Sequence, residues 1–375
     1  MSMSLETQLK AIRDQIDAVD SDWLRLINRR IELAKQVGEI KQAHSDAQLD
    51  AEGGDDAQAG VVIYKPEREA QVIRRLIEEN TGDISDQQIN ILCREIMSIC
   101  RGAEARMRVA VLGPEGTFTE MAALQQFGSS VDMLQKARID QVFSAVETAD
   151  VNYGVVPVEN STEGIVSTTA DLLVSTSLHI AGEIYLPIHQ ALLGVDGDYS
   201  KIRKIYSHAQ SLSQCRLWLL EHLPGVDIEA VSSNAEAARM ASETIDCAAI
   251  AGENAAMQYG LNVLASHIED HKNNTTRFLV LSREEVAPSG RDKTSLLMSC
   301  RNEPGSLFKL LQPMQDHGIS MLKIESRPSK MKRWEYLFFV DIQGHRQDPQ
   351  IARALREVEA AAGYFRVLGA YPCAE

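Results

Sequence analysis

The sequence lacks any run of 18 apolar residues, which is roughly the shortest stretch that spans a bilayer as a helix. Its start, MSMSLETQLK, has neither the charged beginning nor the apolar stretch of a secretory signal, so we expect a cytoplasmic protein. The six cysteines form no CxxC pair, as is typical of reduced thiols. Lysine and arginine number 38 against 53 acidic residues, giving a formal charge of −15, which disfavours nucleic acid and membrane as partners.

Signatures of cofactor and metal chemistry are also missing. There is no GxGxxG and no GK[ST], so neither a dinucleotide nor a nucleoside triphosphate is expected. No serine or cysteine nucleophile has an evident His and Asp beside it. His267 and His271, in HIEDH, lack a convincing third ligand, so we predict no metal and no cofactor.

Charge and hydrophobic rhythm divide the 375 residues into three segments. Residues 1–106 hold 14 basic and 20 acidic side chains and read as helix only. Residues 107–285 hold 11 basic and 23 acidic side chains, and in them short β-type runs alternate with helical stretches. The turn-rich stretch APSG (287–290) precedes the last segment, which holds 13 basic and 10 acidic side chains. We therefore expect domains at 1–106, 107–285 and 290–375.

The first segment predicts a helix over 5–42 with a coiled-coil-like stripe. The stripe, called the apolar seam below, consists of Leu5, Leu9, Ile12, Ile16, Val19, Trp23, Leu26, Leu33, Val37 and Ile40, with Arg30 in the slot between the last leucines. A rod of about 57 Å cannot bury such a stripe against itself. We therefore expect an all-α, intertwined homodimer, with higher oligomers left open.

Two further helices are expected in this segment, from Pro66 to Asn80 and from a Ser85 cap to about residue 105. The stretch 43–60, with five acids and no Lys or Arg, is typical of a solvated surface loop. A role in gating an anion site is the alternative.

Charged side chains on these helices suggest an anion site. Arg30 and Lys41 are 11 residues apart and share a helix face. Arg13 lies about 25 Å from Arg30 along the axis, so it could serve only a partner's site in an antiparallel dimer. Glu104 continues an apolar stripe of the third helix. Taken singly, Arg30 or Glu104 is more simply explained by an ion pair or an edge position.

Together, RRIELAKQVGEIK, KPEREAQVIRRL and REIMSICRGAEA resemble, in order, the three helices of the all-helical chorismate mutase family. The resemblance implies rearrangement of chorismate to prephenate without a cofactor. Arginines would hold the carboxylates, while Lys41 and a protonated Glu104 would donate to the breaking ether oxygen. The matching positions are Arg13 from the partner, Arg30, Lys41, Arg68, Glu69, Cys100, where some members have serine, and Glu104.

The middle segment predicts a two-lobed α/β domain, periplasmic-binding-like, with a cleft at helix N-termini. The runs RVAVL (108–112) and YGVVPV (153–158) lead into GPEGTFTE and ENSTEG, and this order of strand, turn and helix start suits an anion. KIYSHAQSLSQC (204–215) and NNTTRFLVLS (273–282) repeat the pattern.

GPEGTFTE, PVENSTEG, SHAQSLSQC and above all TTRF resemble prephenate dehydratase. The resemblance implies loss of water and CO2 from prephenate to give phenylpyruvate. Thr276 would hydrogen-bond to or protonate the leaving hydroxyl, and Arg277 would anchor a carboxylate. The other implied substrate contacts are Thr117, Asn160, Ser161, Thr162 and Phe278.

The last segment reads βαββαβ, an α+β ferredoxin-like order. It resembles the ACT domain, and PGSLF and ESRP match phenylalanine-binding phrases of dehydratase regulatory domains. The resemblance implies feedback inhibition by L-phenylalanine; a plain dimerisation module is the alternative. The implied effector contacts are Gly305, Ser306, Leu307, Glu325, Ser326, Arg327 and Pro328.

The three resemblances cover nearly the whole chain in one order, so we predict a bifunctional chorismate mutase and prephenate dehydratase of phenylalanine biosynthesis. Its expected partners are chorismate, prephenate, L-phenylalanine and a second copy of the chain. One alternative is a dehydratase that uses arogenate. Another is a non-enzymatic, small-molecule-binding regulator, which does not explain Arg30 in the seam or TTRF.

Overall fold

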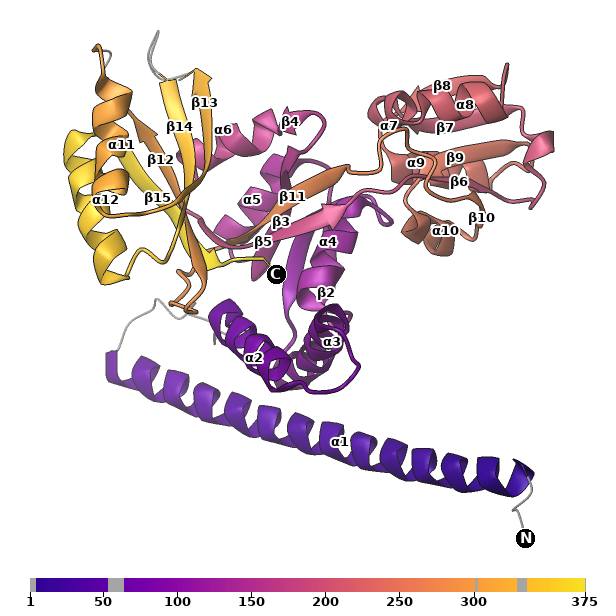
Figure 1. Ribbon diagram of the computed structural model, residues 1–375, viewed down its shortest axis with the longest axis horizontal. Coiled ribbons are helices and arrows are strands. Elements are labelled where there is room, and N and C mark those ends of the chain that lie inside the picture. Colours follow the sequence, from indigo (N-terminus) through magenta and orange to yellow (C-terminus); the bar gives the residue numbers. More distant parts are fainter. Residues whose placement is uncertain (1–4, 53–63, 301–302, 329–335, 375) are drawn as a thin grey trace. The chain divides into compact units, whose positions relative to one another are not determined.

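The computed structural model describes residues 5–52, 64–300, 303–328 and 336–374, with the side chains of 45–52 and 199 left aside (Figure 1). The chain divides into two compact units, which are described separately. The first unit comprises the N-terminal residues up to 65 together with 79–107 and 127–132. The second unit comprises 66–78, 108–126 and 133–375.

In the first unit, α1 (Leu5–Glu52) packs against α3 (Asp86–Glu104). The predicted cap of α3 is confirmed, since Ser85 and Gln88 form a reciprocal capping box. The Ser85 hydroxyl oxygen accepts a hydrogen bond from the Gln88 amide at 3.3 Å, and the Gln88 side chain accepts from the Ser85 amide at 2.9 Å. The helix α2 (Pro66–Glu79), nearly all of which belongs to the second unit, begins at the predicted proline.

The long helix α1 extends ten residues past its predicted end, so the prediction of a loop was wrong for residues 43–52. This stretch, AHSDAQLDAE, has no glycine or proline and contains several good helix formers, and their propensity outweighs the acidic charge. The remaining predicted loop residues, 53–60, lie outside the described residues.

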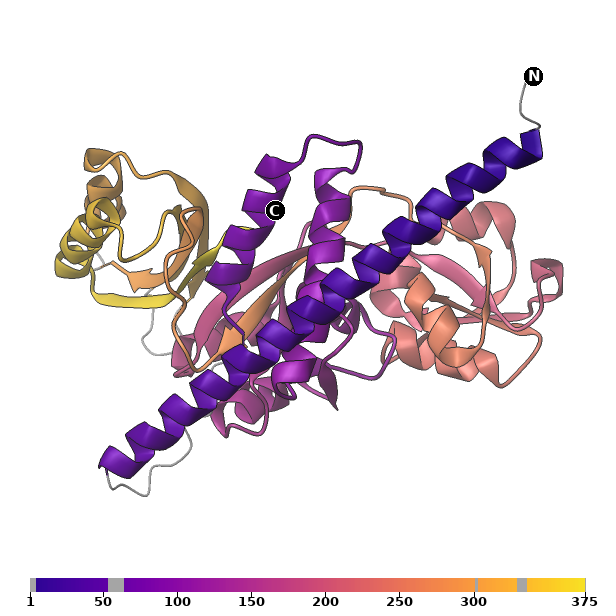
Figure 2. The same ribbon diagram turned by 90° about the horizontal axis from the view of Figure 1, so that it is seen from below.

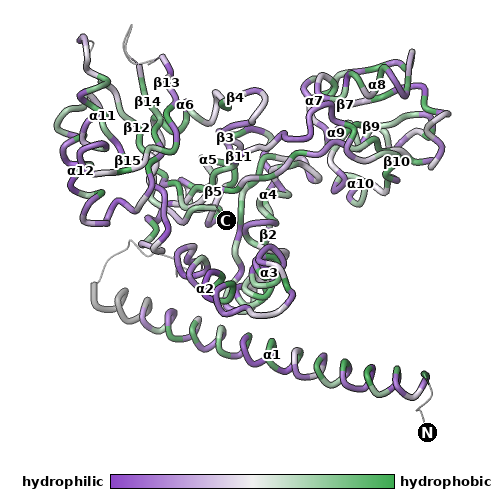
Figure 3. The backbone as a smooth tube through the Cα atoms, in the orientation of Figure 1, coloured by the Kyte–Doolittle hydropathy of each residue, from purple (hydrophilic) through white to green (hydrophobic). Residues whose placement is uncertain are grey.

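One face of α1 meets α3 and another remains uncovered. Half-buried residues on the first face include Arg30, Gly38 and Lys41. Gly38 allows a close approach, because a Cβ there would lie 2.7 Å from Glu104 Cγ. The apolar seam lies elsewhere on α1, and its side chains are 46% to 71% exposed. Figure 3 shows these hydrophobic residues recurring along the helix.

Two mixed sheets in the second unit confirm the predicted two-lobed α/β region. The first lobe has the sheet order β2-β1-β3-β11-β5, with β4 beside β3, and the second lobe has β10-β6-β9-β7-β8 (Figures 1 and 2). The strands are β1 (Arg108–Leu112), β2 (Asp132–Lys136), β3 (Tyr153–Asn160), β4 (Gly164–Ile165), β5 (His179–Pro187), β6 (Ala191–Gly194), β7 (Lys204–His208), β8 (Asp227–Val231), β9 (Cys247–Ala251), β10 (Asn262–Ala265) and β11 (Thr275–Ser282).

The chain passes between the two lobes twice, through what we call the crossing segments, residues 188–190 and 266–274. Helices connect the strands within each lobe, and several begin at the edge that faces the other lobe. They are α4 (Phe118–Phe127), α5 (Ile139–Glu147), α6 (Ser167–Ser175), α7 (Ala209–Gln214), α8 (Arg216–His222), α9 (Asn234–Ser242) and α10 (Glu253–Tyr259), with the short η1 (Tyr199–Lys201).

The C-terminal part, called the sensor below, has the predicted βαββαβ order. Its elements are β12 (Asp292–Ser299), α11 (Ser306–Asp316), β13 (Met321–Pro328), β14 (Tyr336–Gln343), α12 (Pro349–Ala361) and β15 (Tyr364–Pro372), in an antiparallel sheet ordered β13-β14-β12-β15. The sensor shares a hydrophobic core with the first lobe, in which Leu368 and Tyr371 join Val156 and Ile180. At Gly369 a Cβ would overlap the Ile180 carbonyl oxygen. Among the described residues, every helix is too short or too polar to cross a membrane.

Candidate active sites

A cleft of about 290 Å³ lies between the two lobes. Its walls come from both sheets and from the crossing segments, and the starts of α4 and α9 open onto it, as the sequence predicted. The polar residues that line it include Thr117, Asn160, Gln190, His208, Gln210, Ser211, Gln214, Ser232, Ser233, Asn234, Asn274 and Thr276. Phe278, which is 2% exposed, forms part of the apolar wall.

Thr276 is a buried hydroxyl that faces this cleft from β11. The Asn160 side-chain amide donates hydrogen bonds to Thr276 Oγ1 at 2.9 Å and to Asn274 Oδ1 at 2.8 Å. Since Thr276 Oγ1 accepts this bond, its own O–H proton remains available, and no acceptor takes it within the described part of the chain. The arrangement therefore presents a hydrogen-bond donor to a ligand in the cleft.

Strand pairing places Asn160 opposite Thr276, because β3 and β11 run antiparallel in that register. Asn160 is held in turn by Thr162, whose amide and hydroxyl donate to Asn160 Oδ1 at 3.0 and 2.6 Å. Ser161 Oγ accepts from the Thr275 amide at 3.0 Å. Ser161 and Thr162 are exposed and support Asn160 from outside the cleft wall, and their substrate contact stays a prediction.

Thr117 lines the cleft at the start of α4. Its hydroxyl donates to the Leu112 carbonyl at 2.9 Å and accepts from the Glu120 amide at 3.4 Å. It therefore fixes the turn after β1 and the start of α4, where the first N–H groups of the helix can meet an anion.

Arg277, predicted to anchor a substrate carboxylate, contacts two carboxylates of the chain itself. Successive side chains of a strand point to opposite faces, so Arg277 points away from the cleft that Thr276 faces. It is 6% exposed, and its guanidinium lies 2.9 Å from Glu183 Oε2 and 2.7 Å from Asp341 Oδ2. These two carboxylates already hold the cation.

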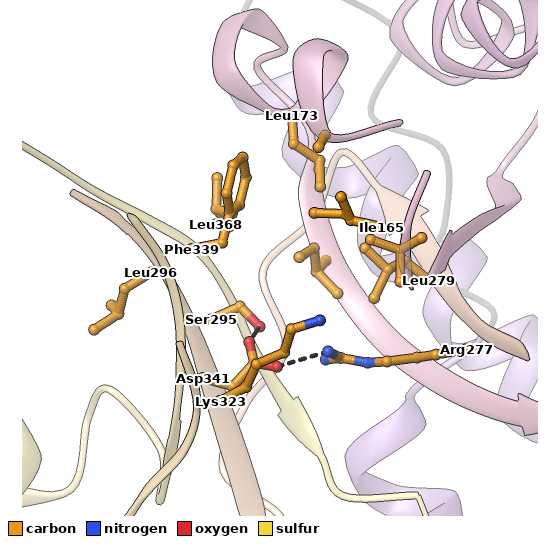
Figure 4. Close-up of a pocket in the computed structure, with 13 residues that line it drawn as sticks. Ile165, Leu173, Arg277, Leu279, Ser295, Leu296, Lys323, Phe339, Asp341 and Leu368 are labelled. Atoms are coloured by element: carbon orange, nitrogen blue, oxygen red, sulfur yellow. Dashed lines mark hydrogen bonds and ion pairs between the residues drawn. The ribbon is translucent and has the colours of Figure 1, made fainter. Parts of the chain in front are cut away.

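Arg277 belongs to a buried polar cluster between the first lobe and the sensor, which we call the junction network. Figure 4 shows three of its members, Arg277, Ser295 and Asp341. The Lys293 ammonium lies 2.6 Å from Glu183 Oε1. Burial alone would lower the pKa of Lys293, but the charge and hydrogen bond of Glu183 hold the pKa above its ordinary value. The members are Glu183, Arg277, Lys293, Ser295, Asp341 and Tyr371.

None of the residues that line the cleft is a lysine or arginine. An anion there must be held by amides, hydroxyls and the backbone N–H groups at helix starts, with His208 as the one imidazole. His208, Gln214 and Asn274 line the cleft but are not among the residues predicted from the sequence. The first two lie within SHAQSLSQC, so the phrase indicated the segment but not which of its side chains face the ligand.

In the first unit the predicted mutase residues of α1 and α3 meet. Lys41 Nζ lies 2.8 Å from Glu104 Oε1, whose side chain is 8% exposed. Arg30 donates to Cys100 Sγ at 2.8 Å. Arg13 is exposed, farther along α1.

Two more predicted mutase residues lie on α2. Arg68 is exposed and Glu69 is half-buried, both in the first turn of that helix. This turn belongs to the second unit and is described with it.

The predicted effector residues lie on two elements of the sensor. Gly305 caps α11 with a φ of 77°, a backbone conformation that favours glycine, and Ser306 and Leu307 follow in the first turn. The segment 325–328 lies on the edge strand β13. Of these residues Arg327 contacts the first lobe, donating to the Ser167 carbonyl at 3.0 Å.

The chain matches the profiles of three known families. Family profiles for chorismate mutase type II, prephenate dehydratase and the ACT domain match residues 12–105, 109–286 and 294–360.

Relatives with both activities in their names match nearly the whole chain. The chain is 47% identical to the bifunctional chorismate mutase/prephenate dehydratase of Stutzerimonas stutzeri over 99% of both chains, and 46% identical to that of Neisseria gonorrhoeae over 100% of this chain and 99% of the relative. A crystal structure of prephenate dehydratase from Arthrobacter aurescens in complex with L-Phe is 33% identical, with a TM-score of 0.65, over 71% of this chain and 90% of that one. The chain therefore belongs to the family of bifunctional chorismate mutase/prephenate dehydratases.

Proposed function

We propose that this chain makes phenylpyruvate from chorismate in two steps, at two separate sites, and that L-phenylalanine inhibits it. Its family membership supports both activities and removes the reading as a non-enzymatic regulator. The observation that carries the proposal is the Thr276 hydroxyl, which is buried, oriented by Asn160 and left with a proton to donate into the cleft.

The dehydratase step follows from this geometry. Prephenate loses its ring hydroxyl as the bond to CO2 breaks and the electron pair of that bond completes the aromatic ring. The Thr276 hydroxyl donates to the leaving oxygen, and the Asn160 amide polarises Thr276 Oγ1. An ordinary threonine is a very weak acid, so Thr276 acts as a donor within a network. The substrate carboxylates are met by backbone N–H groups at the helix starts, including the start of α4, whose preceding turn Thr117 fixes.

The mutase site is completed by two chains in this proposal. Arg30, Lys41 and Glu104 come from one chain, and the partner subunit's Arg13 closes the site. The exposed apolar seam supports the dimer, since a stripe of ten large side chains at 46% to 71% exposure is unusual for a monomer. Pericyclic rearrangement then needs only a compact substrate and donors at the ether oxygen.

Subunit mixing tests the shared site. Chains with Arg13→Ala and chains with Arg30→Ala are each expected to have little mutase activity. After joint unfolding and refolding, half of the dimers are mixed and one of their two sites is intact, so about a quarter of wild-type activity returns. Mixing Arg30→Ala with Lys41→Ala, which lie on the same side of one site, is the control and restores none. No recovery in the first mixture would reject the shared site.

The overall function is tested by supplying chorismate alone and following phenylpyruvate by its ultraviolet absorbance. We expect phenylpyruvate to form, with prephenate as intermediate, and to form more slowly when L-phenylalanine is present. Arogenate in place of prephenate tests the alternative substrate and is expected to react more slowly. Prephenate accumulation without phenylpyruvate would reject the dehydratase assignment.

L-phenylalanine is proposed to bind between Gly305–Leu307 and the segment 325–328. Support comes from the exposed positions of Leu307 and Ser326 on α11 and β13, and from the solved relative, which was crystallised with L-Phe. Calorimetry on the full chain tests it. We expect binding by the wild type and at least tenfold weaker binding by Gly305→Val, because a valine at positive φ distorts the start of α11.

A further inference from the structure

A buried carboxylate in the second crossing segment has two imidazoles as its neighbours. The side chain of Glu269 is 1% exposed. His189 Nδ1 lies 2.9 Å from Glu269 Oε1, and His267 Nδ1 lies 3.6 Å from the same oxygen. Among the described residues no lysine or arginine lies within ion-pair distance of this carboxylate. A buried carboxylate needs positive charge beside it, so something must supply that charge here.

The three side chains present a recognisable set of donor atoms. One atom from each of His189, His267 and Glu269 lies within 4.8 Å of the other two. Two imidazole nitrogens and a carboxylate oxygen are a known three-residue set for zinc, with the fourth position left open. The two imidazole nitrogens converge on one carboxylate oxygen, an arrangement that also lets both bind a single metal ion through their lone pairs.

The surroundings of the cluster hold these donors in place. The Gln190 amide donates to Glu269 Oε2 at 2.8 Å, which leaves Oε1 toward the imidazoles, as an outer partner does for a metal-bound carboxylate. His267 has a φ of 55°, a strained backbone that few residues other than glycine adopt. Such strain persists only where neighbouring contacts fix it, and it is common at functional sites.

The cluster joins the two connections between the lobes. His189 lies in the first crossing segment, and His267 and Glu269 lie in the second. The Ile268 amide donates to the Gln190 carbonyl at 3.0 Å, which pairs the two segments directly. The three side chains are absent from the cleft wall. The cluster is therefore separate from the proposed dehydratase site.

We propose that His189, His267 and Glu269 bind one divalent transition-metal cation of the zinc class, which links the two crossing segments. The sequence predicts no metal at His267 and His271, because this pair lacks a convincing third ligand. The structure gives His267 different partners, from 78 residues earlier in the chain and from Glu269, while His271 is exposed outside this set. The inference does not depend on the proposed catalytic function.

Metal titration of the full-length chain tests this proposal. After treatment with a chelator, and with the cysteines kept reduced, Zn²⁺ is titrated by calorimetry and Co²⁺ by visible absorption. We expect one site per chain and a Co²⁺ spectrum without a thiolate band. His267→Ala and Glu269→Gln should each weaken binding at least about tenfold. His271→Ala is the matched control and should bind as the wild type does.

Two results would overturn the site. One is wild-type protein that binds neither ion near pH 7, with NMR showing a protonated His189 that balances Glu269. The other is binding of equal strength in both variants, which would move the metal to the cysteines or elsewhere. Phenylpyruvate formation by each variant reports its folding. Because metal binding is read directly, its failure is distinct from failure of the dehydratase assignment.

Discussion

The cleft between the lobes and the charged face of α1 and α3 differ in how much of a site one chain supplies. In the cleft, Thr276 already has Asn160 behind it, and both lobes of the same chain provide the walls. On α1, Arg30, Lys41 and Glu104 meet, while Arg13 stays exposed beside an uncovered apolar seam. A domain that buries its own core can complete a site alone, whereas a single long helix requires a partner.

The same two regions also differ in the charged side chains that they contain. The cleft has no lysine or arginine in its wall. Arg277, which follows Thr276 on β11, is turned to the sensor. The helical face relies on Arg30 and Lys41 themselves. In the function proposed above, anion binding in the cleft rests on fixed dipoles, and in the helical unit on formal charges. We expect salt to weaken chorismate binding more than prephenate binding.

The largest expected effect is loss of the donor in the cleft. Thr276→Ala should lower dehydratase turnover about a thousandfold, because the leaving hydroxyl loses its hydrogen-bond donor. Mutase turnover should stay within twofold of wild type, since it uses a different unit. Steady-state assays of both reactions measure this.

Thr275→Ala is the matched control for that change. Thr275 precedes Thr276 on β11 but is absent from the cleft wall, so its loss should alter dehydratase turnover less than threefold. Equal losses in the two variants, or a parallel loss of mutase activity, would contradict separate sites.

The second effect tests Arg277 as part of the junction network. Arg277→Met leaves Glu183 and Asp341 short of a buried cation, so the free energy of unfolding should fall by about 3 kcal/mol. The KM for prephenate should change less than threefold, while about fivefold more L-phenylalanine should be needed for half inhibition. Denaturant unfolding and inhibition curves measure these quantities.

Lys323→Met is the control for the network. Lys323 also pairs with the first lobe, through Glu159, but it is half-buried and its loss should cost less than 1 kcal/mol. A rise of a hundredfold in KM for Arg277→Met, with unchanged stability, would restore the reading of Arg277 as a substrate anchor.

The TTRF motif shows which features of the site can be predicted from the sequence and which cannot. The motif correctly indicated a strand with Thr276 at a polar cleft. Alternation along a strand already implies that Thr276 and Arg277 face opposite ways, but not which face meets the cleft. That depends on Glu183, on the neighbouring strand β5, and on Asp341, which meets Arg277 only after the sensor packs on the first lobe.

The helical segment was predictable for the opposite reason, since its signals are local. The Ser85 cap, the Pro66 start and the shared face of Arg30 and Lys41 follow from spacing and residue type alone. The error at 43–52 came from weighing acidic charge above helix propensity. The cluster around Glu269 was missed because His189 is 78 residues before His267.

The third expected effect is loss of the proposed dimer. Trp23→Glu places a charge in the apolar seam and should lower mutase activity at least tenfold, with a monomer seen by light scattering. Dehydratase activity should remain within twofold, because its cleft lies within one chain. Ser21→Glu adds the same charge outside the seam and should leave both readings unchanged. A variant that stays dimeric with full mutase activity would count against the seam as the interface.

The smallest effect concerns the fit of α1 on α3. Gly38→Ala adds a Cβ 2.7 Å from Glu104 Cγ, so the Glu104 side chain must shift by several tenths of an ångström. Its carboxylate, now 2.8 Å from Lys41 Nζ, would move with it, and we expect mutase turnover to fall about threefold. Ala34→Gly, also on the half-buried face of α1, is the control for changed helix propensity. Because Gly38→Ala raises helix propensity and Ala34→Gly lowers it, a loss in Gly38→Ala cannot come from helix stability, and unchanged turnover in that variant would contradict the role given to the position of Glu104.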